Sequence, residues 1–300
     1  MVACARVGTR ETRAGTKQIV VSILARPSDG CCAAELKSVT GPRNWVFLGD
    51  SLTEGVGWKR ISHVAELAKL LRASEIRSRD KHALKGAVKS NIAGLRIWNF
   101  ACEGKTIESD FEWLPLIGTL QPELVVIFRG SLESIIRPAM IADSDWPWWV
   151  PPSWRNYSAM DPRCYFSTTW WRKAKQTSVD ALKQKARLKL LETRPGKPLI
   201  DLNTFAAHQT KLIKQLRDFG TRVVVLGLLP VDGDRFPGSA EQFKSVNARL
   251  QQIAEAEGVE FFDWASHLNG GALFYRDGFH PNEAGAIALA KILHGFVSRT

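Results

Sequence analysis

Two short blocks near opposite ends of the 300-residue chain carry side chains suited to nucleophilic catalysis. The first block is Gly-Asp-Ser-Leu at 49–52, directly after the apolar run 45–48, and its serine is Ser51. A serine at the start of a helix lies where backbone N–H groups are unpaired, so its own N–H can face a developing oxyanion. The second block places Asp277 three residues before His280, where the carboxylate can orient the imidazole and stabilise the cation that forms when histidine takes a serine proton. Each block alone is also compatible with helix capping.

The elements that must position these blocks alternate along the chain. Apolar runs predict strands at 45–48, 95–100, 124–128, 222–228 and 259–262, and helical periodicity predicts helices at 54–73, 172–192, 202–219, 239–257 and 282–297. Continuous apolar strands between amphipathic helices indicate an α/β fold, in which a central, mostly parallel five-stranded sheet is covered on both faces to give three α/β/α layers. Sheets of this kind place their chemistry at the carboxyl ends of the strands.

Together, the two blocks resemble those of the GDSL, or SGNH, hydrolases. In that family the nucleophilic serine lies in a Gly-Asp-Ser-Leu block near the N-terminus, and an Asp-x-x-His block near the C-terminus completes the triad. Residues 49–52 and 277–281 match both blocks in the expected order, and the resemblance covers about 44–297. It implies a flavodoxin-like sheet.

The resemblance also implies a role for each residue of the two blocks. Ser51 is expected as the nucleophile, His280 as the general base and then acid, and Asp277 as the orienting carboxylate. The implied activity is that of a serine hydrolase that cleaves carboxylic esters through an acyl-enzyme, without a metal or another cofactor. The tryptophan-rich loop and the basic surface favour a substrate with a short acyl group, such as acetyl on a carbohydrate.

The oxyanion hole is expected from backbone N–H groups. Gly104 follows the second predicted strand, at the position of the family's second block, and its N–H would join that of Ser51 as a donor. A glycine suits this role because it lets the backbone approach a substrate closely, although a turn also favours glycine.

The third block departs from the family pattern of Gly-x-Asn-Asp. Gly130 matches, but Leu132 stands where the asparagine is expected and Glu133 replaces the aspartate. Leucine cannot donate a hydrogen bond. Three alternatives stay open: Arg129 or Ser131 substitutes as a donor, two backbone donors suffice, or the chain is a catalytically weak relative.

Three segments fall outside the predicted catalytic domain at 44–300 or interrupt it. Residues 1–43 are expected to form an irregular N-terminal arm, with one edge strand at 18–24. A basic insertion is expected at about 72–94, and an insertion rich in tryptophan and proline at about 140–171.

The second insertion holds six of the eleven tryptophans. Its prolines exclude a regular helix or a central strand. Because it lies between the third and fourth predicted strands, we expect it above the active-site edge, with Trp148 and Trp149 as candidates for a wall of the substrate site. A satellite core or a protein interface explains the same tryptophans equally well.

Rival motifs are weaker. Gly-Lys-Thr at 104–106 lacks the earlier glycine of a P-loop, because Asn99 stands there. Asp263 and His267 form a second acid–histidine pair, which we interpret as ordinary polar structure at a strand end.

Composition limits the remaining classes. The chain is 45% hydrophobic and 24% charged, and it has no apolar run of transmembrane length. Its net charge of +11 permits acidic partners without requiring them, and we expect a small-molecule or saccharide ester as the partner rather than nucleic acid. Five scattered cysteines and the absence of a signal-peptide pattern favour a cytoplasmic location.

Two alternatives to an esterase stay open. One is an O-acyltransferase that acts on a saccharide, and the other is a binding protein that retains the fold. The sequence also leaves the oligomeric state open.

Overall fold

The computed structural model describes residues 6–11, 17–22, 43–55, 61–76, 95–139, 146–155, 158–268 and 273–298. Within these ranges, no helix is both long enough and apolar enough to cross a membrane. The predicted basic insertion falls mostly on residues 77–94, which lie outside the described part of the chain.

Five parallel strands form the central sheet, as predicted. They are β3 (Arg43–Gly49), β4 (Leu95–Asn99), β5 (Leu124–Phe128), β8 (Arg222–Leu226) and β9 (Glu260–Phe262), in the spatial order β4-β3-β5-β8-β9. The chain therefore starts the sheet near its middle and adds strands on both sides, which is the flavodoxin-like order. In such sheets the crevice at the carboxyl ends, next to the first strand, is where ligands bind.

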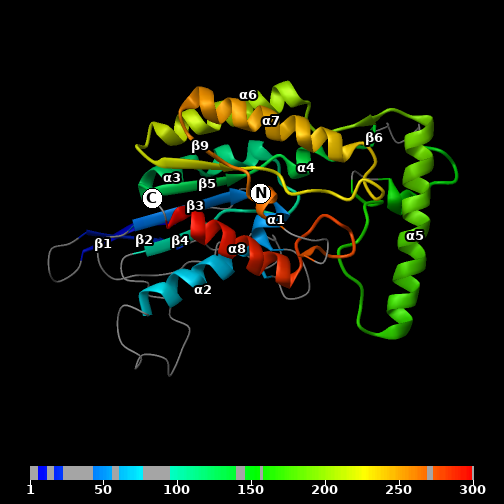
Figure 1. Ribbon diagram of the computed structural model, residues 1–300, viewed down its shortest axis with the longest axis horizontal. Helices are drawn as coiled ribbons and strands as arrows, with labels where there is room; N and C mark the ends of the chain where they lie inside the picture. The colour runs from blue at the N-terminus through cyan, green and yellow to red at the C-terminus, as the bar shows by residue number, and fades with distance from the viewer. Residues whose placement is uncertain are drawn as a thin grey trace.

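Helices cover both faces of this sheet (Figure 1). One face carries α2 (His63–Ile76) and α8 (Glu283–Val297), which pack against each other. The other face carries α3 (Leu114–Leu120), α6 (Leu202–Arg217) and α7 (Ser239–Glu257). The predicted three-layer α/β/α architecture is thus confirmed.

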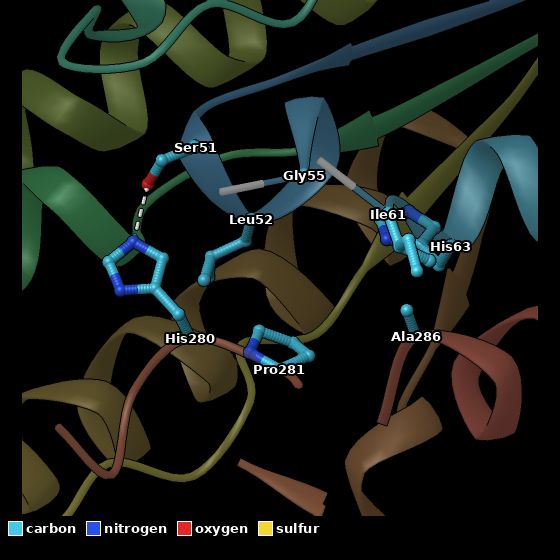
Figure 2. Close-up of a pocket in the computed structure, with 8 residues that line it drawn as sticks. All are labelled: Ser51, Leu52, Gly55, Ile61, His63, His280, Pro281 and Ala286. Atoms are coloured by element: carbon cyan, nitrogen blue, oxygen red, sulfur yellow. Dashed lines mark hydrogen bonds between the residues drawn. The ribbon is translucent and has the colours of Figure 1, made fainter. Parts of the chain in front are cut away.

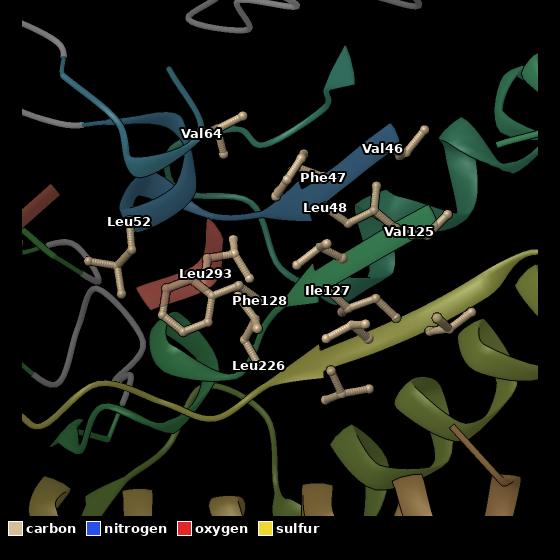
Figure 3. Close-up of a cluster of buried hydrophobic side chains, with 14 of the residues drawn as sticks. Val46, Phe47, Leu48, Leu52, Val64, Val125, Ile127, Phe128, Leu226 and Leu293 are labelled. Atoms are coloured by element: carbon tan, nitrogen blue, oxygen red, sulfur yellow. The ribbon is translucent and has the colours of Figure 1, made fainter. Parts of the chain in front are cut away.

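The core lies between these layers (Figure 3). The three middle strands read as unbroken apolar runs because both of their faces are buried. Val46 and Leu48 of β3 and Val125 and Ile127 of β5 have at most 1% of their surface exposed. Leu293 of α8 packs into the same cluster from one face of the sheet.

Three expectations about local structure need correction. The segment expected as an edge strand at 18–24 is β2 (Lys17–Ser22), which pairs antiparallel with β1 (Arg6–Glu11) in a separate two-stranded sheet. The helix expected at 54–73 is divided: α1 (Ser51–Glu54) ends at Gly55, whose φ of 90° ends the helix, and α2 starts at His63. A 3₁₀ helix, η2 (Ile107–Trp113), and α3 were not predicted, because segments this short show little periodicity.

The longest helix, α5 (Trp170–Thr193), stands beyond the carboxyl edge of the sheet (Figure 1). It is joined to the main body by a short antiparallel pair, β6 (Arg137–Pro138) with β7 (Gly196–Lys197). The buried guanidinium of Arg187 adds two hydrogen bonds, to the carbonyl oxygens of Ile136 at 2.8 Å and Arg235 at 2.7 Å. These contacts hold α5 beside the strand ends.

Candidate active site

Ser51 stands at the first turn after β3. Asp50 is the N-cap of α1, and its carboxylate accepts the N–H of Leu52 at 2.9 Å. A Cβ on Gly49 would lie 2.1 Å from the Oγ1 of Thr53, so only glycine fits where the strand turns into the helix. The Gly-Asp-Ser-Leu sequence thus makes the sharp strand-to-helix turn that places Ser51 at the carboxyl edge of the sheet.

Asp277 and His280 lie in the loop that precedes α8. The Oδ1 atom of Asp277 accepts the backbone N–H groups of Phe279 and His280, both at 3.1 Å. Asn282 caps α8 by accepting the N–H of Gly285 at 3.0 Å. Gly278 has a φ of 66°, and a Cβ there would lie 2.3 Å from the Cβ of Asp232, so this tight loop also requires glycine.

The tertiary structure brings the two blocks into contact across 229 positions of sequence (Figure 2). The Oγ of Ser51 lies 2.9 Å from Nε2 of His280, and Nδ1 of His280 lies 2.7 Å from Oδ2 of Asp277. Asp277 is fully buried, whereas the His280 side chain is 18% exposed. This chain of contacts has the geometry of a nucleophile, a general base and an orienting carboxylate.

The loop after β4 carries Gly104 to the same edge. The N–H of Cys102 donates to the carbonyl of Gly49 at 3.2 Å, and the N–H of Glu103 donates to the carboxylate of Glu54 at 2.5 Å. Gly104 itself is exposed and has a φ of 72°, with open space where a side chain would project. The loop is therefore anchored to the turn that holds Ser51, and Gly104 borders solvent.

Arg129 does not serve as a free donor for an oxyanion. Its guanidinium is buried and forms a two-point ion pair with Asp110, at 2.8 Å from Nε and 2.5 Å from Nη2. Its remaining terminal nitrogen donates to the carbonyl of Lys105 at 2.6 Å. Arg129 was one of two candidates to substitute for the missing asparagine, and each of its three nitrogens already donates a hydrogen bond to Asp110 or Lys105.

The other candidate, Ser131, begins the short helix α4 (Ser131–Ser134). Its hydroxyl is buried, and no hydrogen-bond partner for it is found in the described part of the chain. Leu132 next to it is half-buried, and its side chain offers no donor. Ser131 consequently remains a candidate donor.

Glu133 has a structural place that its position in the third block did not predict. Its buried carboxylate accepts the N–H of Ile107 at 2.7 Å and that of Gly130 at 3.2 Å, and so links the loops after β4 and β5. Burial raises the pKa of Glu133 to about 7, with the charge of Arg129 opposing the shift. Burial likewise raises the pKa of Asp50. Both acids thus lie in a poorly solvated layer close to Ser51, together with the buried Arg129.

Behind the triad lies a small cavity of about 10 Å³, lined by Ser51, His280 and a residue that sequence reasoning missed, His63 (Figure 2). Neither ring nitrogen of His63 has a hydrogen-bond partner among the described residues, and its ring meets those of Phe128 and Trp264 edge-on. Burial lowers the pKa of His63 to about 3, so the ring is neutral at working pH. His63 is a lone histidine at the start of α2, and no motif in the sequence indicates that it would lie near Ser51 and His280.

The tryptophans of the insertion are not arranged as the expected wall of the substrate site. Trp149 packs, together with Trp146 and Trp154, on a small buried cluster. This cluster includes Met160 of the insertion and Leu190 of α5. Trp148 is 91% exposed, and neither Trp148 nor Trp149 lines a cavity that touches the triad. This arrangement matches the satellite-core interpretation of the insertion.

A cysteine that the sequence did not single out lies against the triad. Cys164 offers a sulfur within 4.8 Å of ligand atoms of Asp277 and His280, a set that could hold a metal ion. Burial raises the pKa of the Cys164 thiol to about 12, and the charge of Asp277 adds to the shift. A metal bound there would occupy the atoms through which Asp277 and His280 meet, so the cluster competes with a proton-transfer role for His280.

Comparisons with known proteins agree with this fold. The GDSL-like Lipase/Acylhydrolase family model matches residues 175–287, a range that contains Asp277 and His280 but not Ser51. Among curated proteins, none matches the sequence.

Several solved structures share the fold. LAE5, an alpha/beta hydrolase enzyme from the metagenome of Lake Arreo, Spain, superposes with a TM-score of 0.52 at 15% identity, over 87% of this chain and 97% of that one. Axe2, an acetylxylan esterase from Geobacillus stearothermophilus, gives 0.50 at 17% identity, over 86% of this chain and 94% of that one. The acetyl xylan esterase AlAXEase gives 0.51 at 12% identity, over 85% and 99%.

The layered sheet and its strand order define a three-layer α/β/α fold, which LAE5 shares. The family match over residues 175–287 supports the resemblance to the GDSL, or SGNH, hydrolases that the two blocks predicted. The family match also bears out the prediction of an ester-hydrolysing enzyme.

Proposed function

We propose that this enzyme hydrolyses carboxylic esters through an acyl-enzyme on Ser51. The observation that carries the proposal is the unbroken chain of contacts from Ser51 Oγ through His280 to Asp277, at 2.9 and 2.7 Å. These contacts support the roles that we propose for Ser51 as nucleophile, His280 as base and Asp277 as orienting group, which ester hydrolysis requires.

The first half of the reaction forms the acyl-enzyme. Ser51 Oγ attacks the ester carbonyl carbon while Nε2 of His280 takes the hydroxyl proton. The N–H groups of Ser51 and Gly104 donate to the oxyanion, and Asp277 stabilises the imidazolium. Collapse breaks the bond to the alcohol oxygen, and His280 returns its proton to the leaving alcohol.

The second half restores the enzyme. Water loses a proton to His280 and attacks the acyl carbon, and collapse of this second tetrahedral intermediate returns the proton to Ser51 Oγ. The released products are the carboxylic acid and free Ser51. No step needs a metal or a cofactor.

The substrate we propose is a short-chain ester, acetyl above all, on a carbohydrate. Two of the structures that share the fold are named as acetyl xylan esterases, which supports this choice. The cytoplasmic location stays a prediction from the sequence, and cell fractionation tests it.

The proposal is tested with a fluorophosphonate probe and p-nitrophenyl acetate. Wild type should be labelled and should release p-nitrophenol, whereas Ser51→Ala should lose both properties. Ser245→Ala, which removes an exposed hydroxyl on α7, is the matched control and should behave as wild type. Labelling that survives in Ser51→Ala contradicts the proposal, and an unlabelled wild type points to the binding-protein alternative. Product analysis with added sugar acceptors separates hydrolysis from acyl transfer.

A further inference from the structure

An open cleft of about 740 Å³ begins beside the proposed triad, and the steps of the proposed reaction do not involve its walls. Cys164, Tyr275 and Arg276 line its inner end. Cys164 is the residue whose sulfur lies within 4.8 Å of ligand atoms of Asp277 and His280, and Arg276 directly precedes Asp277. A molecule in this cleft would therefore extend from the reacting serine toward α5.

The walls of the cleft suit a sugar. Phe166 and Arg276 stack on one another, with the guanidinium carbon 3.5 Å from the ring centroid. Tyr165, with 47% of its surface exposed, and Tyr275 add rings that carry a hydroxyl. Aromatic faces pack against the C–H faces of sugar rings while hydroxyl groups bond their edges, so these walls favour a saccharide over a purely apolar chain.

The lining of the cleft is positively charged. It includes Lys173 and Arg276 but no aspartate or glutamate. Arg276 is partly balanced by the buried Asp180, at 3.3 Å, whereas Lys173 has no ion-pair partner in the ranges that the structure describes. Lys173 thus presents an unbalanced charge to whatever occupies the cleft.

The position of Lys173 in α5 adds to this potential. Arg172, Lys173 and Lys175 are all exposed in the first two turns of the helix, whose first turn holds no acidic residue. Cations at a helix N-terminus oppose the helix dipole and cost stability. A local rule broken in this way at the mouth of a cleft is a sign of function.

The inner end of the cleft has a more balanced charge. There Arg276 lies 3.3 Å from the buried Asp180 and directly precedes Asp277 in the sequence. An anionic group on the substrate is therefore attracted chiefly to the Lys173 end, which orients the ester toward Ser51.

We propose that the cleft binds the alcohol part of the substrate, and that this part is an acidic saccharide whose carboxylate faces Lys173. The inference rests on the proposed esterase function and narrows its substrate to esters of uronate-bearing sugars. Anionic membranes and nucleic acids are other polyanions, but they do not need the sugar-sized cleft between aromatic walls.

The test compares one substrate in two charge states. The probes are an O-acetylated oligouronide and the same oligouronide with its carboxylates methyl-esterified, and acetate release is measured for both. Wild type should favour the free acid in kcat/KM at low salt, and most of that preference should disappear at about 0.5 M salt, because exposed charges are screened. Equal rates on both probes, or faster release from the neutral one, overturn the inference.

Variants locate the effect. Lys173→Gln should lower the preference by about two- to fivefold, the size of one exposed charge pair, and Lys173→Glu should lower it further. Lys175→Gln is the matched control, because a residue two positions along the helix points elsewhere, and it should keep the wild-type preference. An equal loss in Lys175→Gln and Lys173→Gln means a diffuse basic surface and contradicts the cleft.

Binding separates the failure of this inference from that of the proposed function. The Ser51→Ala protein, which should not turn over, should still bind the free-acid oligouronide more tightly than its methyl ester. If wild type cleaves p-nitrophenyl acetate but Ser51→Ala shows no such binding preference, the proposed esterase function is supported and the proposal of an acidic saccharide is overturned. If Ser51→Ala binds anionic phospholipid vesicles and ignores the oligouronide, the charge serves a membrane and the inference is overturned.

Discussion

Nδ1 of His280 lies 2.7 Å from Oδ2 of Asp277, while Oδ1 of the same carboxylate is held by two backbone N–H groups. The two oxygens of this carboxylate thus have different partners, and this arrangement predicts the effect of Asp277→Asn. Because the carbonyl of an asparagine would face the two N–H groups, its NH₂ would face Nδ1 and force the proton onto Nε2. His280 could then no longer take the proton of Ser51, so we expect kcat to fall about 10²–10⁴-fold.

Steady-state kinetics on p-nitrophenyl acetate check this expectation. Asp263→Asn, which changes an exposed carboxylate at another strand end, is the control and should retain activity. A loss of less than about threefold in Asp277→Asn would mean that the carboxylate does not orient His280.

Gly104 is expected to contribute a backbone donor to the oxyanion hole. Gly104→Pro removes that N–H and should lower kcat about 10²–10³-fold. Gly104→Ala keeps the N–H, and its Cβ meets open space, so only the strain of a φ of 72° remains and the loss should be small. Because proline also cannot adopt a φ of 72°, comparing kcat of the two variants at matched folded fraction measures the N–H donor together with its position in the loop. Wild-type turnover in Gly104→Pro would remove Gly104 from the hole.

Leu132 stands where the family carries asparagine, and Leu132→Asn should restore a donor near the oxyanion. We expect activity to be retained and kcat to rise, by less than the about 10²–10³ that a fully preorganised donor is worth. Leu132→Ala, which shortens the side chain without adding a donor, should not show the rise. A large loss of kcat in Leu132→Asn alone would show that this position does not face the reacting carbonyl.

The buried ion pair between Arg129 and Asp110 should be structural. Removing one partner leaves a buried charge, so Arg129→Met or Asp110→Asn should each lower the free energy of unfolding by about 3–5 kcal/mol. The double variant Arg129→Met with Asp110→Asn should lose less than the sum of the two single losses, because neither member of the pair is then left without the other. Urea unfolding of the four proteins measures the coupling. Additive losses in the double variant would contradict the pairing.

His63 predicts a pH dependence of stability. In the folded protein burial lowers its pKa to about 3, whereas the unfolded chain has the ordinary 6.5. Between these values only the unfolded chain binds the proton, so the free energy of unfolding falls as pH drops, by about 1.4 kcal/mol per unit. His63→Phe removes this slope, and relative to wild type it should gain about 2 kcal/mol between pH 6.5 and pH 5.

Urea unfolding at several pH values provides the measurement. The exposed His267 supplies the control, since His267→Gln should leave the slope of wild type unchanged. Parallel curves for wild type and His63→Phe would show that His63 is protonated in the folded state.

Local sequence predicted the strands, the long helices and the three residues of the proposed triad. Runs such as 124–128 are apolar throughout because both faces of a central parallel strand are buried, and this pattern is visible without coordinates. The Gly-Asp-Ser-Leu turn is equally local, since Gly49 and Asp50 act on residues at most four positions away. Short elements such as α4 escaped prediction because four residues carry no readable period.

Tertiary structure alone decided which polar groups are still free to act. Arg129 was a candidate donor in the sequence, and only the fold shows its guanidinium held by Asp110 from 19 positions away. His63 and Cys164 gave no local signal, yet packing sets one behind the triad and the other beside it. Contacts of this kind depend on how distant segments meet at the sheet edge, whereas helix and strand patterns depend on neighbours in sequence.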